Sequence, residues 1–301
     1  MIPVFPKFKK LSLSDKASIE SITSDFEPYS NYNFTNLWAW DFDKTAKISK
    51  LNGNLVIICT DHFLSKTSVN FLGNNKINET LKALFAYLNK YNLEAVLSAV
   101  PRISVQGADP DLYEIVPNRS SYDYLYDLNS LSYFTEPKYS HKRKAANQFA
   151  RKFPSAELRA LNLMKTQTIE SIATLNKSWL SHKDKALGDK EFKHESSAIK
   201  RYIDARFSNS LCLGLYIDNE MVGYSFFSLL NGGFALCQFS KADTKFSGIY
   251  EYLMRESASF LVTKGYTKLN YEEDLGIEGL RQAKLSYKPL SFLEKYDVRE
   301  I

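Results

Sequence analysis

The most informative stretch of the chain reads Asn270-Tyr-Glu-Glu-Asp-Leu-Gly-Ile-Glu-Gly-Leu-Arg-Gln-Ala-Lys-Leu-Ser-Tyr-Lys-Pro289. Its three adjacent carboxylates close an expected strand, residues 267–273, and an expected helix begins after Gly276, where apolar residues fall at helical spacing. Arg281 and Lys284 form a basic stripe beside the apolar one. Open α/β sheets tend to place ligand sites at the carboxyl ends of their strands. We therefore expect the functional site at this strand end.

The charged residues of this stretch suit the chemistry of acyl transfer. A carboxylate can hold an ammonium group or act as a base, and a cation can stabilise a phosphate or a developing oxyanion. Glu273, Asp274, Arg281 and Lys284 are therefore the candidate catalytic residues. In the competing interpretation they are structural: Asp274 caps the helix that follows, and Glu272 pairs with a nearby lysine.

Composition narrows the class of protein. With 301 residues the chain suits two domains of about 150 residues, and its 44% hydrophobic and 14% aromatic content excludes a disordered protein. No apolar run reaches the roughly 18 residues of a membrane helix, so we expect a soluble, cytoplasmic protein. Three distant cysteines and four histidines without ligand spacing predict neither a disulfide framework nor a metal site.

The same order of elements occurs twice along the chain. An Asn52-Gly53 dipeptide marks a two-residue hairpin turn in the first half, and an Asp218-Asn219-Glu220 turn marks a hairpin in the second. In each half a third strand, an amphipathic helix and a returning strand follow. This repetition predicts a tandem arrangement of two similar α+β domains.

A basic segment lies between the two halves. Residues 138–152 contain six Lys or Arg, one His and no carboxylate. Phe149 and Phe153, four residues apart, predict a helix over residues 138–153 with one apolar side. Such a helix is either a solvated surface or a site for a polyanion such as tRNA, to which Lys142, Arg143 and Lys144 would contribute. We place the two domains at residues 1–135 and 136–301, and the second begins with this helix.

Several segments resemble a known family. They are Ser30-Asn-Tyr-Asn-Phe-Thr-Asn-Leu-Trp-Ala-Trp40, Tyr122-Asp-Tyr-Leu-Tyr-Asp127, Lys138-Tyr-Ser-His-Lys-Arg143, the stretch from Glu273 to Pro289, and Glu294-Lys-Tyr296. The chain resembles the DUF2156 family, which is similar to the C-terminal region of phosphatidylglycerol lysyltransferases. The resemblance implies an α+β (mixed α/β) fold of two tandem GNAT-like domains, each a mostly antiparallel sheet flanked by helices.

The resemblance also implies a donor. Lysyltransferases of this kind move an aminoacyl group from aminoacyl-tRNA to a lipid head group. Ordinary GNAT enzymes instead hold the pyrophosphate of acyl-CoA in a loop at a helix N-terminus. The equivalent loop here, Lys245-Phe-Ser-Gly-Ile-Tyr250, keeps the cation and the central glycine, so Lys245, Ser247 and Gly248 are candidate donor-binding or phosphate-binding residues. Tyr250 replaces a small residue, which weakens the case for acyl-CoA.

The leading hypothesis is an acyltransferase that uses aminoacyl-tRNA and an amine or hydroxyl acceptor, which can be a small molecule, a peptide or a lipid head group. Two alternatives stay open. One is an acyl-CoA-dependent N-acyltransferase. The other is a non-catalytic protein that binds a ligand or a nucleic acid on a GNAT scaffold, because a fold does not fix a function.

Overall fold

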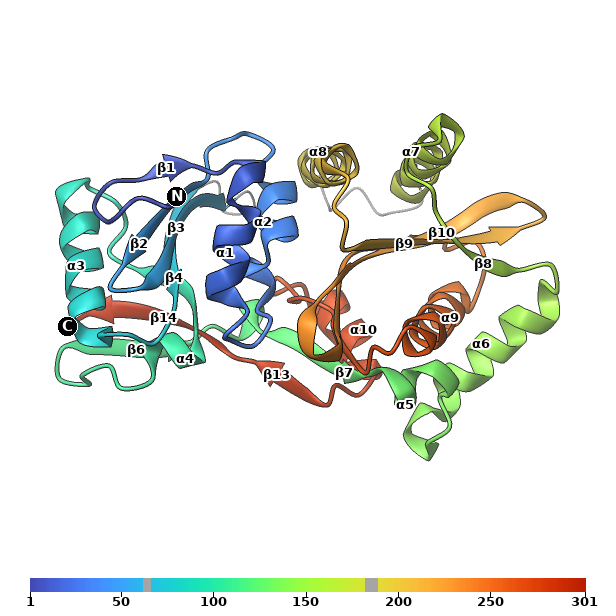
Figure 1. The fold of residues 1–301 in the computed structure, drawn as a ribbon. Coiled ribbons are helices and arrows are strands. Elements are labelled where there is room, and N and C mark those ends of the chain that lie inside the picture. Colours follow the sequence, from blue (N-terminus) through green and yellow to red (C-terminus); the bar gives the residue numbers. More distant parts are fainter. Residues whose placement is uncertain (62–65, 182–188) are drawn as a thin grey trace. The chain divides into compact units, whose positions relative to one another are not determined.

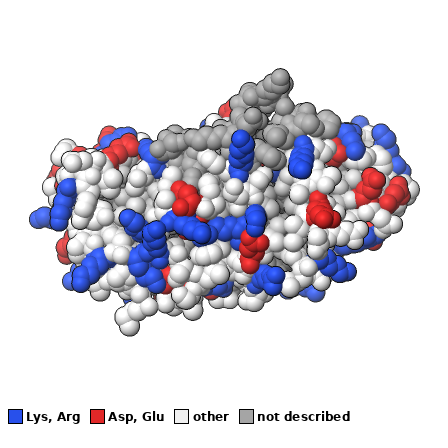
Figure 2. All heavy atoms as spheres, turned by 90° about the horizontal axis from the view of Figure 1, so that it is seen from above, with Lys and Arg blue, Asp and Glu red and all other residues white. Residues whose placement is uncertain are grey.

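The computed structural model describes residues 1–61, 66–181 and 189–301. The fold is mixed α+β, with mostly antiparallel sheets flanked by helices, as the sequence predicts (Figure 1). On the face drawn in Figure 2, Lys and Arg side chains gather in a row with Asp and Glu side chains beside it. Positive charge is thus concentrated locally although the net charge is only +5.

The chain forms two compact units that interleave along the sequence. The first unit consists of Met1–Asp123, Glu273–Leu280 and Phe292–Ile301. The second consists of Tyr124–Glu272 and Arg281–Ser291. The expected domains, 1–135 and 136–301, divide the chain at a single point. The chain instead crosses from one unit to the other four times. The C-terminal residues therefore belong to the unit that begins at the N-terminus.

The first unit contains two small sheets. One has the order β1-β2-β3-β4 with antiparallel neighbours, and the other has the order β5-β14-β6. The β2–β3 hairpin turns at Asn52 and Gly53, both at positive φ, as the sequence predicts. The strands are β1 (Lys9–Lys10), β2 (Lys47–Leu51), β3 (Asn54–Asp61), β4 (Lys66–Leu72), β5 (Leu97–Pro101), β6 (Tyr113–Pro117) and β14 (Lys295–Glu300).

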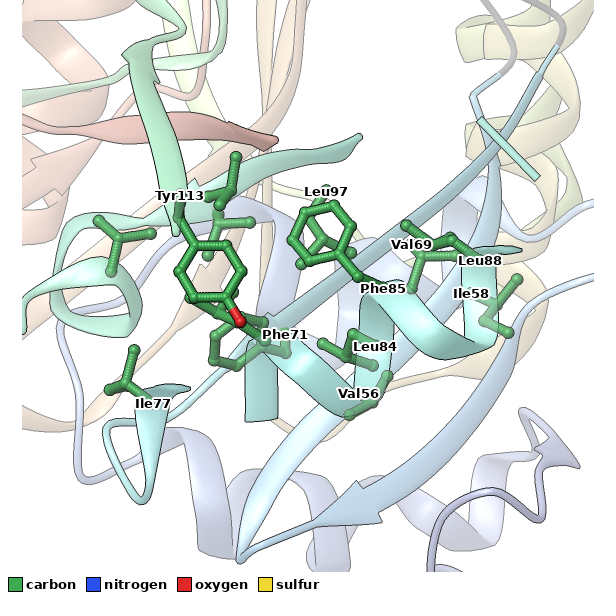
Figure 3. Packing of buried hydrophobic residues seen from close by; sticks show 14 residues of the cluster. Val56, Ile58, Val69, Phe71, Ile77, Leu84, Phe85, Leu88, Leu97 and Tyr113 are labelled. Carbon is green, nitrogen blue, oxygen red and sulfur yellow. The ribbon is translucent and has the colours of Figure 1, made fainter. Parts of the chain in front are cut away.

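The core of the first unit lies under α3 (Ile77–Lys90). The helix repeats apolar residues at intervals of three and four, so Leu81, Leu84, Phe85 and Leu88 share one buried face. Figure 3 shows Leu84, Phe85 and Leu88 of this face. They pack against strand residues that include Phe71 of β4. The unit also contains α1 (Lys16–Thr23), α2 (Phe34–Trp40) and α4 (Arg102–Val105).

The large sheet has seven strands in the order β13-β7-β12-β11-β10-β9-β8. Of the pairs from β7 to β8, β11 and β12 run parallel and the others antiparallel. The strands are β7 (Asp123–Asp127), β8 (Glu157–Ala160), β9 (Ser210–Ile217), β10 (Glu220–Leu229), β11 (Phe234–Ala242), β12 (Lys268–Asn270) and β13 (Ser291–Leu293). The expected order of hairpin, strand, helix and strand is present in each unit, as β2-β3-β4-α3-β5 and β9-β10-β11-α9-β12, while the duplication of a domain stays a proposal.

Helices cover both faces of this sheet in the second unit (Figure 1). On one face Phe149 of α6 and Leu253 of α9 pack with Leu215 and Val222 of the sheet. On the other face Tyr202 of α8 stacks on Phe226 of β10. The helices of the unit are α5 (Leu128–Tyr133), α6 (Ser140–Lys152), α7 (Thr166–Ser181), α8 (Asp189–Ala205) and α9 (Ile249–Thr263), and α10 (Glu278–Ser286) begins in the first unit and continues into the second.

The parallel pair β11–β12 is short and leaves part of β11 as an edge. Pairing covers only Phe234 to Leu236 on the β11 side. A register shift in the β10–β11 pair then leaves Gln238 as an extra residue, and such bulges bend a strand and increase its twist. β11 continues to Ala242 without β12 beside it, so backbone groups of its last residues need other partners.

Gly248 is required by the packing of α6 on α9. It has φ +83°, and a Cβ at this position would lie 2.6 Å from the carbonyl oxygen of Ala145 in α6. Gly265, after the same helix, has φ +86° but no atom within 4 Å of the equivalent Cβ. The two glycines therefore share a backbone strain and differ in the steric contact.

We expect Gly248→Ala to lower the free energy of unfolding more than Gly265→Ala does. Gly265→Ala should cost about 1–2 kcal/mol from the left-handed backbone alone, and Gly248→Ala should exceed it by at least about 1 kcal/mol because α6 must shift. Urea unfolding followed by circular dichroism measures both. Equal losses would show that α6 does not press on Gly248.

Candidate functional site

The acidic segment after β12 folds as two tight turns instead of continuing the strand to residue 273. β12 ends at Asn270, whose side-chain oxygen accepts the N–H of Glu272 at 2.8 Å. Glu272 has φ +56°, a left-handed conformation that few non-glycine residues adopt. Asp274 Oδ1 then accepts the N–H of Gly276 at 2.9 Å. These turns, and not strand alternation, direct the acidic side chains.

Glu273 belongs to a polar cluster in the first unit that is built around Lys295. Lys295 Nζ lies 2.7 Å from Asp123 Oδ1 and 3.1 Å from Glu273 Oε2. Ser30 donates its hydroxyl to Asp123 Oδ1 at 2.6 Å and its backbone N–H to Asp123 Oδ2 at 2.7 Å. The side chains of Lys295 and Asp123 are fully buried, whereas Glu273 is 22% exposed. Among these three charged groups, Glu273 is the one that a substrate can reach.

The charge of Lys295 is maintained by the two carboxylates. Burial disfavours the ammonium form, but the negative charges of Asp123 and Glu273 and their hydrogen bonds outweigh it, so the pKa of Lys295 is raised. Asn31 also accepts a hydrogen bond from this ammonium. Lys295 is therefore a fixed cation at neutral pH.

Sequence reasoning missed Ser30, Asp123 and Lys295 as site residues. Each lies in a segment that was noted for its resemblance to a family, namely 30–40, 122–127 and 294–296. The resemblance indicated membership of a family. It did not indicate that these residues contact one another, because Ser30 and Lys295 are 265 residues apart in the sequence. Only the fold brings them together with Glu273.

Asp274 has a structural environment. Its side chain is fully buried and lies 3.2 Å from Arg119 Nη1, in addition to forming the turn with Gly276. The Arg119 guanidinium also lies over the rings of Tyr122 and Phe292, at 5.4 and 4.7 Å from their centroids. Asp274 thus stabilises the turn before α10, close to the capping role that the structural interpretation assigned to it.

The two basic candidates lie on α10, in the part that belongs to the second unit. Lys284 is buried, donates a hydrogen bond to the carbonyl oxygen of Tyr271, and lies 5.0 Å from the centroid of the Tyr271 ring. Its own carbonyl accepts the hydroxyl of Tyr126 at 2.8 Å. Arg281 is half-buried one turn earlier. Lys284 therefore anchors α10 to the end of β12.

The basic helix uses part of its charge inside the second unit. Lys142 pairs with Glu251 of α9 at 3.0 Å and lies 4.0 Å from the centroid of the Tyr287 ring. Arg143 donates to carbonyl oxygens at the end of α5, including that of Thr135 at 3.2 Å. Lys144 is exposed. The sequence showed no acidic partner for this run, because Glu251 lies more than 100 residues away.

The loop before α9 holds the three candidate phosphate-binding residues. Lys245 is exposed and pairs with Asp243 at 3.0 Å, Ser247 is exposed, and Gly248 precedes the first turn of α9. Gly248 faces the backbone of α6, so its lack of a side chain is explained by packing. Lys245 and Ser247 stay predictions as ligand-binding residues.

A second buried lysine, Lys241 of β11, was not identified from the sequence. Its side chain is 3% exposed, pairs with Glu195 of α8 at 2.6 Å, and places Nζ 3.5 Å from the centroid of the Trp179 ring. Burial lowers the pKa of Lys241, although Glu195 acts in the opposite direction. Trp179 in turn donates its indole N–H to the Tyr250 hydroxyl at 3.1 Å. No group of His, Cys, Asp and Glu suited to a metal ion occurs within residues 1–61, 66–181 and 189–301.

These features define a mixed α+β protein with the same order of elements in each unit and a buried lysine paired with a carboxylate in each. The chain belongs to the family described as "Phosphatidylglycerol lysyltransferase, C-terminal", which it matches over residues 24–299. No curated protein matches the chain significantly in sequence.

Solved structures share the fold over nearly the whole chain. A conserved protein of unknown function from Bacteroides thetaiotaomicron is 24% identical, with a TM-score of 0.84 and coverage of 100% of both chains. The DUF2156 C-terminal domain of a putative lysylphosphatidylglycerol synthetase from Agrobacterium fabrum is 11% identical, with a TM-score of 0.62 and coverage of 96% of this chain and 92% of that one. L-PGS from Bacillus licheniformis is 13% identical, with a TM-score of 0.60 and coverage of 95% and 91%.

The family and the fold confirm the resemblance drawn from the sequence, and they support a protein related to lysylphosphatidylglycerol synthetases. None of the helices in the described part of the chain combines the length and the hydropathy needed to span a bilayer.

We expect Lys295→Met to lower the free energy of unfolding by about 3–5 kcal/mol, because it leaves two carboxylates at a buried position without their cation. Lys200→Met is the control. Its pair with Asp204 is more than half exposed on both sides, so it should change stability by less than about 1 kcal/mol.

The pH dependence of this loss has a defined sign. The pKa of Lys295 is raised in the folded protein, so its contribution is complete below the unfolded value of about 10.5 and is lost as the pH rises through the folded value. The difference between the wild type and Lys295→Met should therefore persist at neutral pH and shrink above about pH 10.5. A difference that disappears near neutral pH would contradict a charged Lys295.

Proposed function

We propose that this protein is an acyltransferase that takes an aminoacyl group from aminoacyl-tRNA and passes it to an amine or hydroxyl acceptor. The observation that carries the proposal is the exposure of Glu273 at the surface of the Lys295 cluster. Lys295 holds its carboxylate by a hydrogen bond at 3.1 Å, and the hydroxyl oxygen of Ser30 lies 3.3 Å from the same carboxylate. A carboxylate held in this way is suited to receive an ammonium group, and an aminoacyl ester carries one beside its reactive carbonyl.

The transfer itself needs positioning more than activation, because the aminoacyl ester is already reactive. The nucleophile forms a bond to the carbonyl carbon, the bond to the ribose oxygen breaks, and one proton passes overall from the nucleophile to that oxygen. When an enzyme holds two reactants in a reactive geometry, this orientation supplies a large part of the increase in reaction rate. In this proposal Glu273 orients the donor through its ammonium group, while Arg281 stays a candidate for contact with phosphate or the oxyanion.

The basic helix supports tRNA as the carrier of the aminoacyl group. Lys144, Arg151 and Lys152 of α6 are exposed, so their charges face solvent. Clustered exposed cations bind the phosphates of nucleic acids by releasing counterions. Lys142 and Arg143, which the sequence suggested for this role, contribute mainly to the packing of the second unit.

The edge of β11 argues against acyl-CoA. The side chain of Tyr250 reaches the backbone N–H of Ala242 at 3.3 Å, on the part of β11 that β12 leaves unpaired. The GNAT resemblance places the acyl-CoA donor beside this edge and at the following loop. Tyr250 occupies the position where a small residue admits that donor, which favours a donor of another kind.

We expect Glu273→Gln to lower the rate of aminoacyl transfer by about 10- to 100-fold, because the amide keeps the shape but loses the charge that holds the ammonium group, worth about 1.5–3 kcal/mol in charged hydrogen bonds. The assay follows radiolabelled amino acids from a pool of charged tRNA to phosphatidylglycerol vesicles and, in parallel, to a small primary amine.

The matched control for this change is Glu157→Gln. Glu157 is an exposed carboxylate paired with Arg159 in the second unit, and its loss should leave the rate unchanged. Transfer by the wild type from acetyl-CoA but from no charged tRNA would sink the aminoacyl proposal and establish the acyl-CoA alternative. Binding of tRNA without any turnover would point to a non-catalytic protein.

We expect the combined change of Lys144, Arg151 and Lys152 to Gln to weaken binding of uncharged tRNA. Each lost phosphate contact should make the slope of log K against log salt less steep by about 0.7–0.9. Fluorescence anisotropy with labelled tRNA at several salt concentrations measures this slope. The control triple Lys50, Lys82 and Lys90 to Gln removes three exposed cations from the first unit. An equal loss in both triples would mean that α6 is not a specific tRNA surface.

A further inference from the structure

Asn31 contacts the Lys295 cluster through one end of its amide group. The residue lies in the short helical turn Ser30–Tyr32, which precedes α2, and is half-buried. Its Oδ1 accepts a hydrogen bond from Lys295 Nζ. An ammonium group can only donate, so this bond determines which end of the amide is the oxygen and directs Nδ2 away from Lys295. The two N–H donors of Asn31 are therefore held in one orientation.

These N–H donors are accessible, and within the described part of the chain they have no protein partner. The printed contacts of the Asn31 side chain all involve Oδ1, which accepts from Lys295 and lies 3.3 Å from Ser30 Oγ. The buried side-chain atoms that lack a partner include Asn36 Oδ1 but not Asn31 Nδ2, so the Asn31 nitrogen is open to solvent. A ligand can therefore accept a hydrogen bond from it.

Glu273 and Asn31 are the two members of the cluster that reach solvent. The side chains of Ser30, Asp123 and Lys295 are almost fully buried, and all five residues belong to the first unit. Glu273 Oε2 and Asn31 Oδ1 both lie within hydrogen-bond distance of the same nitrogen, Lys295 Nζ, which places these two oxygens within about 6 Å of each other. A ligand beside Glu273 therefore has a carboxylate and an amide donor within reach.

This pair of groups matches the reacting end of an α-aminoacyl ester. The ammonium group and the carbonyl oxygen of such an ester are only three bonds apart. Glu273 accepts a hydrogen bond from the ammonium, and Asn31 donates one to the carbonyl oxygen. A carboxylate alone would bind many cations, whereas the two groups together select a cation that has an acyl carbonyl beside it.

Lys295 makes Asn31 a stronger donor. Hydrogen bonds that form a chain polarise one another, and the Lys295 ammonium draws electron density from the amide through Oδ1. The charge persists at neutral pH, because the two carboxylates raise the pKa of Lys295 against the effect of burial. A donor that is held in place before the reaction stabilises negative charge on a carbonyl oxygen without having to reorganise.

We propose that Asn31 donates a hydrogen bond from Nδ2 to the carbonyl oxygen of the aminoacyl group and stabilises the negative charge that forms there. The inference rests on the proposed function and specifies its donor as an ester of an α-amino acid with a free amino group. As the nucleophile bonds to the carbonyl carbon, an electron pair of the C=O bond moves onto the oxygen, and it returns when the bond to the ribose oxygen breaks. Asn31 keeps its protons, and the proton of the nucleophile passes to the ribose oxygen, so atoms and charge balance.

The test compares Asn31→Asp with Asn78→Asp in the aminoacyl-transfer assay with charged tRNA. Asn31→Asp keeps an oxygen for Lys295 and replaces the N–H donors by a second oxygen. It should lower kcat by about 100-fold or more and keep KM within about threefold, because the loss of one donor to an oxyanion costs about that factor.

Asn78 is the matched control, since it is also a half-buried amide of the first unit. Its oxygen accepts the backbone N–H of Asp109 at 2.8 Å, and its nitrogen donates to the carbonyl of Gly107 at 3.3 Å. Asn78→Asp should keep kcat within about twofold. Asn31→Ala removes the donor without adding a charge, so it should again lower kcat by about 100-fold.

A spectroscopic measurement on the wild type does not depend on the folding of any variant. The probe is an analogue of alanyl-adenosine in which an amide nitrogen replaces the ester oxygen, so that the ammonium and the carbonyl remain. Its addition should shift the side-chain amide resonances of Asn31 in a proton–nitrogen correlation spectrum and leave those of Asn78 in place.

Two results overturn the inference and leave the proposed function standing. One is binding of the analogue without a shift of the Asn31 resonances. The other is a folded Asn31→Asp or Asn31→Ala with kcat near that of the wild type, while Glu273→Gln still lowers the rate. A wild type without transfer from charged tRNA overturns both.

Discussion

The ion pair between Lys295 and Asp123 is the contact on which the first unit most depends. Asp123 is the last residue before the chain enters the second unit, Glu273 is the first residue after it returns, and Lys295 follows the second return at Phe292. One buried ammonium therefore fastens three separate passages of the chain. Buried ion pairs add little net stability over an apolar core, but losing one partner is costly. The cluster therefore matters more through the cost of losing one partner than through the net stability that it adds.

The turns after β12 determine which acidic residue is available for chemistry. A left-handed Glu272 interrupts the strand, and such strained conformations persist only where the surrounding structure holds them. Asp274 is then committed to Arg119 and to the turn before α10. Glu273, between them, joins the Lys295 cluster and keeps part of its surface exposed. Three adjacent carboxylates thus have different environments, which neither charge nor spacing along the chain distinguishes.

The features that the sequence predicted correctly are those that depend on neighbouring residues in the chain. The Asn52-Gly53 hairpin, the amphipathic α3 and the order of elements in each unit follow from turn chemistry and periodicity, and the structure confirms them. It did not predict the return of β14 to the first unit, because pairing between residues almost 200 apart leaves no local pattern. For the same reason it named Glu273 but neither Lys295 nor Lys241, since a lysine is normally exposed and only tertiary contacts reveal a buried one.

The two buried lysines show how a single residue type can serve opposite purposes. Lys295 lies against two carboxylates, and its pKa is raised even though burial opposes the charge. Lys241 has one carboxylate and an aromatic face, and there burial prevails and lowers its pKa. The first environment suits a permanent charge that positions Glu273. The second binds its proton less firmly, because one carboxylate and one aromatic ring compensate less for burial. The number of carboxylates around each buried ammonium therefore decides the direction of its pKa shift.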